Sequence, residues 1–321
     1  MCIRYVEEGH VIRGQLPVAG PHTLTWRSIK KRAFGPEALT AYLFILPSFI
    51  GFTTFYAVPA VRAVIISFTE WNLLRAPRNI GLDNYERLLA DPLFWNAMKV
   101  TGLYVLYNIP IQVVLGLFLA VAMHRLTQSM IIRGVLVLPY LVSNVVIGLA
   151  FLWILDPILG TANMLLGWFG IPRQPFIGSP DQALASIAGI NIWRHMGFTA
   201  LLFYAGLQSI PKSLYEAATI DGAGEGRLFL HISLPLLRPV TVFVLVTSVI
   251  GSFQIFDTIA VMTQGGPVNA TRAIVWYIYE NAFQFFRMGY ASALSVVLFM
   301  ILISITILQM RLLQGNRSDM E

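Results

Sequence analysis

Residues 288–310 read MGYASALSVVLFMILISITILQM, a run without a charged side chain that lies between Arg287 and Arg311. A helix needs about 20 mostly apolar residues to cross the hydrocarbon core of a bilayer, which is roughly 30 Å thick. This run is long enough, and it predicts a transmembrane helix.

The same test, applied along the rest of the chain, finds four more charge-free runs and a fifth that contains Arg194 and His195. We therefore expect six spans, at residues 38–61, 100–124, 134–155, 183–206, 239–256 and 288–310. Prolines within or near these runs are compatible with spans, because neighbouring helices can satisfy the carbonyls that they free. The predicted fold class is all-α, a polytopic membrane protein.

The composition excludes an ordinary soluble domain. Only 12% of the 321 residues are charged and the mean hydropathy is +0.68, whereas soluble domains carry about 25% charged residues. The net charge of +6 fits the basic loops of a membrane protein, and the sequence has no recognisable nucleic-acid-binding module. Cys2 is the single cysteine, which excludes an internal disulfide, and the scattered histidines predict no metal site.

Basic residues predict the orientation, because Lys and Arg concentrate on the cytoplasmic side. A cluster precedes the first span: Arg27, Lys30, Lys31 and Arg32. We expect a cytoplasmic N-terminal tail over residues 1–37, without the apolar core of a signal peptide. Six spans then return the tail at 311–321 to the cytoplasm. The loop at 62–99 fits this rule less well, since it also carries basic residues.

Residues 211–238 read PKSLYEAATIDGAGEGRLFLHISLPLLR and are too polar to lie in lipid. Ser213 and Glu216 have the spacing of a capping box, which predicts a helix start. Three glycines from position 222 onward end that helix, and a second short helix over 227–234 is expected to stop at Pro235. The pattern predicts a helix–turn–helix at the membrane surface, either a docking element for another protein or an ordinary charged surface.

This loop resembles the coupling-loop signature of the permeases of binding-protein-dependent ABC importers. The resemblance rests on nine residues: Glu216, Ala217, Ala218, Asp221, Gly222, Ala223, Ile232, Leu234 and Pro235. In that family the loop fits a cleft on a cytoplasmic ATPase. The resemblance implies that Glu216 faces a basic residue of the ATPase and that Gly222 permits the tight turn.

The resemblance covers most of the chain and favours the carbohydrate branch. Its further landmarks are Gly160 with Asn163, the run Gly265-Gly266-Pro267, and the run Gly289-Tyr290-Ala291. Within that branch the chain resembles the first permease subunits of maltose and glycerol-3-phosphate systems more than their shorter-tailed partners. The resemblance implies a type I permease fold, a bacterial inner membrane, a related second permease, an extracytoplasmic solute-binding protein and an ATPase dimer. ATP and Mg²⁺ would bind those ATPase subunits, since the sequence lacks a Walker motif, and this chain would be no enzyme and hold no cofactor.

The fourth predicted span carries the candidate cargo residues. Asn191, Arg194, His195 and Phe198 follow the i, i+3, i+4, i+7 spacing of one helical face. In maltose-type permeases the sugar-contacting positions match these residues and also Tyr140, Asn144, Ser248 and Ser252. Arg194 and His195 depart from that pattern, and a guanidinium favours carboxylate or phosphate. We hypothesise an anionic carbohydrate, such as a uronate oligosaccharide or a sugar or polyol phosphate. The alternative is a neutral oligosaccharide, with Arg194 either paired to an acidic group of a partner permease or extended outward to the membrane surface.

Two other classes of protein compete with this interpretation. An ion-coupled secondary transporter needs carboxylates within its spans, but Asp257 lies only at the edge of one. A membrane-embedded enzyme needs a nucleophile with its base, or a metal cluster, and the sequence offers neither. We therefore expect no catalytic residues.

Overall fold

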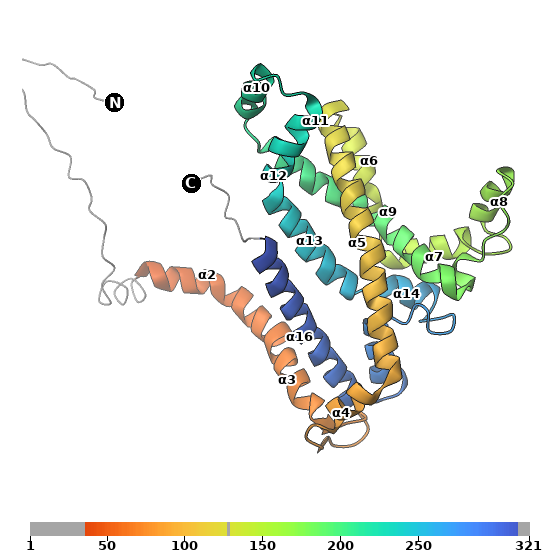
Figure 1. Cartoon of the computed structure of the whole chain (residues 1–321). Helices are drawn as coiled ribbons and strands as arrows, with labels where there is room; N and C mark the ends of the chain where they lie inside the picture. Colours follow the sequence, from red (N-terminus) through yellow and green to blue (C-terminus); the bar gives the residue numbers. More distant parts are fainter. Residues whose placement is uncertain (1–35, 127–128, 314–321) are drawn as a thin grey trace, which may run out of the picture. The chain divides into compact units, whose positions relative to one another are not determined.

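The computed structural model describes residues 36–126 and 129–313, and most of them are helical (Figure 1). The chain separates into two compact units, with the boundary between Ala60 and Val61. The described part of the first unit holds α2 (Pro36–Phe52), the π-helical turn η1 (Thr53–Ala57) and the start of α3 (Val58–Ser67). The predicted tails, 1–37 and 311–321, lie almost wholly outside the described residues.

The second unit is built from helices and one short hairpin. The helices are α4 (Asp83–Ala90), α5 (Pro92–Leu126), α6 (Met130–Leu141), α7 (Asn144–Ile154), α8 (Thr161–Trp168), α9 (Pro180–Gln208), α10 (Lys212–Ile220), α11 (Glu225–Leu228), α12 (Leu234–Leu236), α13 (Arg238–Phe253), α14 (Asp257–Met262), α15 (Ile274–Tyr279) and α16 (Met288–Leu313). The short turns are η2 (Phe176–Gly178), η3 (Phe229–Ser233) and η4 (Glu280–Gln284). Strands β1 (Thr69–Glu70) and β2 (Arg78–Asn79) pair antiparallel.

Four described stretches are long and apolar enough to cross a membrane: Ala38–Ser67, Pro92–Leu126, Arg238–Met262 and Met288–Leu313. A fifth span exists if α6 and α7 count as one. The predicted all-α polytopic fold is confirmed. The remaining predicted span, 183–206, lies within α9, which is long enough at 29 residues but too polar to pass the same test. The count of six spans stays a prediction.

The third predicted span, 134–155, is interrupted rather than continuous. Helices α6 and α7 bend by 90° at Val142 and Ser143, whose ψ angles of 142° and 137° are extended. Gly197 on α9 adjoins α6, where a Cβ would collide with the carbonyl oxygen of Leu136. This close approach and the break give α6 an exposed carboxyl end beside α9.

The core follows α5 and α9, which form the most extensive helix pair in the second unit. Small residues allow them to pack closely: a Cβ on Gly116 of α5 would lie 2.5 Å from Cγ2 of Thr199 on α9. Around this contact Ala120, Ala200 and Phe203 are fully buried. Helix α13 packs against both helices, so three helices surround one interior space.

The two ends of α5 carry different contacts (Figure 1). At the carboxyl end, Arg125 forms an ion pair with Glu225 of α11. At the amino end, Tyr277 and Tyr290 donate hydrogen bonds of 2.5 and 2.6 Å to Asp91. Burial alone would raise the pKa of Asp91, but these hydroxyls and backbone N–H groups outweigh it and lower the pKa below the ordinary 3.8. The α10–α11 loop and α4 therefore lie at opposite ends of a helix of 35 residues.

Candidate functional site

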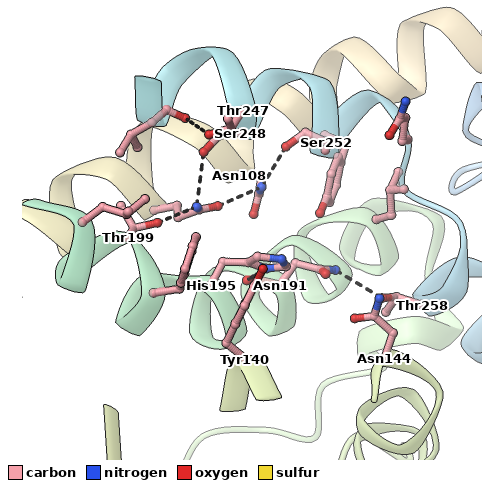
Figure 2. A pocket seen from close by; sticks show the side chains of 18 residues that line it. Asn108, Tyr140, Asn144, Asn191, His195, Thr199, Thr247, Ser248, Ser252 and Thr258 are labelled. Carbon is pink, nitrogen blue, oxygen red and sulfur yellow. Dashed lines mark hydrogen bonds between the residues drawn. The ribbon is translucent and has the colours of Figure 1, made fainter. Parts of the chain in front are cut away.

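A cavity of about 290 Å³ opens between α5, α9 and α13, with α6, α7 and α14 at its margin (Figure 2). Every predicted cargo residue except Arg194 lines it: Tyr140, Asn144, Asn191, His195, Phe198, Ser248 and Ser252. The structure therefore brings together side chains from four helices that the sequence could relate only through landmarks.

One wall of the cavity is aromatic. Tyr140 stacks on Phe198 with ring centroids 4.4 Å apart and an interplanar angle of 9°, and its edge meets His195 at 5.6 Å. Phe198 and His195 lie on one face of α9 with Asn191, as the helical spacing predicts. An aromatic face bordered by polar groups suits a sugar ring, which is apolar on its faces and hydroxylated on its rim.

Arg194 lies behind this wall instead of in the lining. Its Nη2 donates to the carbonyl oxygens of Tyr140 and Val142 at 3.0 and 3.3 Å, and its Cζ lies 5.2 Å from the centre of the Tyr140 ring. Carbonyls at the end of a helix lack intrahelical partners. The guanidinium thus stabilises the carboxyl end of α6 and holds Tyr140 at the cavity.

His195 is also engaged on both ring nitrogens. Its Nδ1–H donates to the carbonyl oxygen of Asn191 at 2.8 Å, which leaves Nε2 to accept from Nη1 of Arg194 at 3.1 Å. In this arrangement His195 has no free N–H for an anion in the cavity. Arg194 keeps an unpaired Nε–H, but that atom is buried and Arg194 does not line the cavity.

Sequence reasoning missed the contribution of α5. Asn108 and Gln112 are only 3% and 5% exposed and reach the cavity from the second predicted span. Amides within an otherwise apolar run were the available signal, because they face protein or water rather than lipid. Further polar lining residues that the sequence did not single out are Tyr104, Thr199, Thr247, Gln254 and Thr258.

Polar side chains at the α7–α14 margin satisfy one another. Asn144 donates to Asp257 at 2.7 Å, and Asn191 donates weakly to Thr258 at 3.4 Å. The lining as described is dominated by amides and hydroxyls, and apart from tyrosines His195 is its single ionisable side chain. Such a surface can exchange hydrogen bonds with hydroxyl groups in both directions.

The second candidate site is the loop of α10, α11 and α12, which forms the predicted helix–turn–helix. Gly222 has φ +80°, a left-handed conformation that favours glycine. The N–H groups of Gly222 and Ala223 donate back to the carbonyls of Thr219 and Ala218 at 3.0 and 2.9 Å. This pair of hydrogen bonds is a Schellman motif, and it ends α10.

Two local predictions about this loop are wrong. Ser213 caps no helix, because α10 begins at Lys212 after Pro211 and has no side-chain cap. Pro235 does not end the second helix, because the helical turns continue through it to Leu236.

The predicted coupling residues divide by exposure. Glu216, Ala217, Asp221, Gly222, Leu234 and Pro235 are exposed, whereas Ala218, Ala223 and Ile232 are half-buried. Ile232 packs on the core cluster that includes Leu237, and the hydroxyl of Tyr215 bonds that of Ser233 at 2.9 Å. The loop is therefore fixed to the helix bundle on one side and free on the other.

Comparison with known proteins assigns the family. Residues 112–317 match the family model of the binding-protein-dependent transport system inner membrane component. This chain belongs to that family. The matched region includes the whole loop and the α9 and α13 walls of the cavity.

Full-length relatives agree. The chain is 35% identical over 281 residues to the sulfoquinovosyl glycerol transport system permease protein SmoG of Agrobacterium fabrum, covering 87% of this chain and 91% of the relative. It is 33% identical over 293 residues to the arabinooligosaccharides transport system permease protein AraP of Bacillus subtilis, covering 89% and 91%. The chain is a transport subunit of the ABC permease class and not itself an enzyme.

The fold has a solved counterpart. A chain in the crystal structure of a bacterial alginate ABC transporter, in complex with an alginate pentasaccharide-bound periplasmic protein, superposes with a TM-score of 0.74. The match covers 89% of this chain and 96% of that chain, at 24% identity. The predicted type I ABC importer permease fold is confirmed.

Proposed function

We propose that this chain is one permease subunit of an ATP-driven importer for a carbohydrate, in the inner membrane of a bacterium with both termini in the cytoplasm. The cavity carries the proposal: an aromatic wall of Tyr140 and Phe198 faces amides and hydroxyls from three helices. The named cargoes of SmoG and AraP, a sulfoquinovosyl glycerol and arabinooligosaccharides, support the same class.

The proposed assembly contains a related second permease, a cytoplasmic ATPase dimer that binds ATP and Mg²⁺, and an extracytoplasmic solute-binding protein. The exposed face of the α10–α11 loop docks on the ATPase through Glu216, Ala217 and Asp221, while Ile232 and Tyr215 transmit movement to the bundle. The periplasmic protein in the alginate transporter complex supports the binding-protein partner.

The charge of the cargo divides two versions of this proposal. The anionic version requires Arg194 to leave its place behind the wall and release the carbonyls of Tyr140 and Val142, and charged hydrogen bonds are costly to break. The neutral version uses the lining as it stands. The contacts of Arg194 therefore favour a neutral oligosaccharide, and the anionic cargo is the second candidate because a guanidinium lies directly behind the wall.

The test is a reconstituted complete transporter presented with arabinotriose, maltotriose, sn-glycerol 3-phosphate and an alginate trisaccharide, each with binding protein. ATPase stimulation and uptake by a neutral trisaccharide support the neutral version. Stimulation by the acidic compounds alone supports the anionic one. Uptake driven by a proton gradient without ATPase subunits would contradict the proposal and favour a secondary transporter.

A further inference from the structure

Asn108 on α5 has one polar atom that the protein leaves unpaired. Its Nδ2 donates to Oε1 of Gln112 at 3.3 Å and to Oγ of Ser252 at 3.0 Å. An amide nitrogen has two hydrogens, so both donors are used. Its Oδ1 is buried and accepts no hydrogen bond within the described chain, although a buried acceptor without a partner costs free energy.

Gln112 pairs with this amide one turn further along α5. Its Nε2 donates to Thr199 at 2.9 Å and to Ser248 at 3.4 Å, so its Oε1 faces Asn108. Turning the Asn108 amide alone would set its oxygen against that oxygen, acceptor against acceptor, and turning both amides would require the hydroxyls of Thr199, Ser248 and Ser252 to donate instead of accept. In the observed network the NH₂ group faces Ser252 of α13, and the carbonyl oxygen points away from α13. Figure 2 shows this oxygen pointing into the space between α5 and the side chains of α9.

We propose that Oδ1 of Asn108 accepts a hydrogen bond from one hydroxyl of the cargo and is a specificity-determining group. This inference rests on the proposed carbohydrate function and deepens it. A cargo that presents a hydroxyl to Asn108 pairs the buried oxygen. A carboxylate or phosphate at the same position brings oxygen against oxygen and is rejected. A site built around one hydrogen bond discriminates strongly against an analogue that lacks the matching donor.

The test uses the neutral trisaccharide that stimulates the reconstituted transporter, arabinotriose or maltotriose, with its full set of monodeoxyfluoro analogues. Fluorine is similar in size to a hydroxyl group but cannot donate. With the native chain, one fluorinated position should raise the KM of cargo-stimulated ATPase about tenfold, the effect of one net hydrogen bond. In Asn108→Ala that analogue and the parent sugar should have the same KM.

Asn108→Asp is the comparison, because it keeps the acceptor, although its second oxygen faces Oε1 of Gln112 and should raise the KM for every cargo. It should retain the fluorine penalty at that one position. Equal fluorine penalties in the native chain and in Asn108→Ala overturn the inference and leave the carbohydrate proposal standing. Failure of both trisaccharides to stimulate overturns the neutral-carbohydrate proposal, and this inference with it.

Discussion

The α10–α11 loop and the polar cavity are built in opposite ways. The loop is one continuous segment, exposed on its free side and ordered by backbone features such as the left-handed Gly222. The cavity collects single side chains from separate helices, and its most buried amides, Asn108 and Gln112, are paired across the bundle. A segment that docks on a partner can be recognised from contiguous residues, whereas a cargo site is defined by contacts between distant ones.

The largest effect is expected where α9 approaches α6, because the cavity wall depends on that contact. Gly197→Ala places a Cβ against the carbonyl oxygen of Leu136 and should destabilise the protein by about 2–3 kcal/mol, as overpacking does. Thermal unfolding of the purified transporter measures it. Gly189→Ala, on the same helix with nothing within 4 Å, is the control, and equal melting temperatures would contradict the packing account.

Arg194 sharpens the difference between a cargo ligand and a supporting residue. Arg194→Met removes the donors to Tyr140 and Val142 and should cost about 2 kcal/mol, the loss expected for a charged hydrogen bond. The KM of ATPase stimulation should rise by a similar factor for neutral and for acidic cargo. Arg194→Lys is the comparison, because it keeps the positive charge but loses the planar guanidinium that reaches both carbonyls. A loss confined to acidic cargo would restore the anionic hypothesis.

Two glycine-to-alanine substitutions test whether the backbone conformation of the α10–α11 loop matters for coupling. Gly222→Ala puts a Cβ on a residue with φ +80° and should destabilise this turn by about 1–2 kcal/mol. The coupling of cargo binding to ATP hydrolysis should therefore fall, while cargo preference stays unchanged. Gly224→Ala, at φ −75°, should leave both unchanged. A changed cargo preference in Gly222→Ala would break the division between loop and cavity.

These cases show what the sequence could and could not predict. Charge-free runs located the long helices, and the contiguous loop carried its own signature. The break at Val142 and Ser143 was not visible, because both are ordinary residues and the carbonyl of Val142 is bound by Arg194 from another helix. Asn108 and Gln112 were passed over because their partners, on α9 and α13, are distant in the sequence. Arg194 was grouped with the residues of α9 that line the cavity, but it lies behind Tyr140 because of a tertiary contact.

The smallest expected effect concerns the bond that fixes the loop to the bundle. Tyr215→Phe removes the hydrogen bond to Ser233 and should cost about 1 kcal/mol, seen as a lower unfolding temperature. Ser233→Ala should cost a similar amount. The double variant should be little worse than either single one, since both remove the same bond. Fully additive losses would show that the two hydroxyls act separately.

The central claim is that the ATPase binds the α10–α11 loop. Site-specific photo-crosslinking in the assembled transporter tests it. Ile220 in the loop and Val268 between α14 and α15 are matched in exposure, at 86% and 85%. A photoreactive side chain at position 220 should capture an ATPase subunit, and one at position 268 should not. Capture of the ATPase from position 268, or from neither position, would contradict the account.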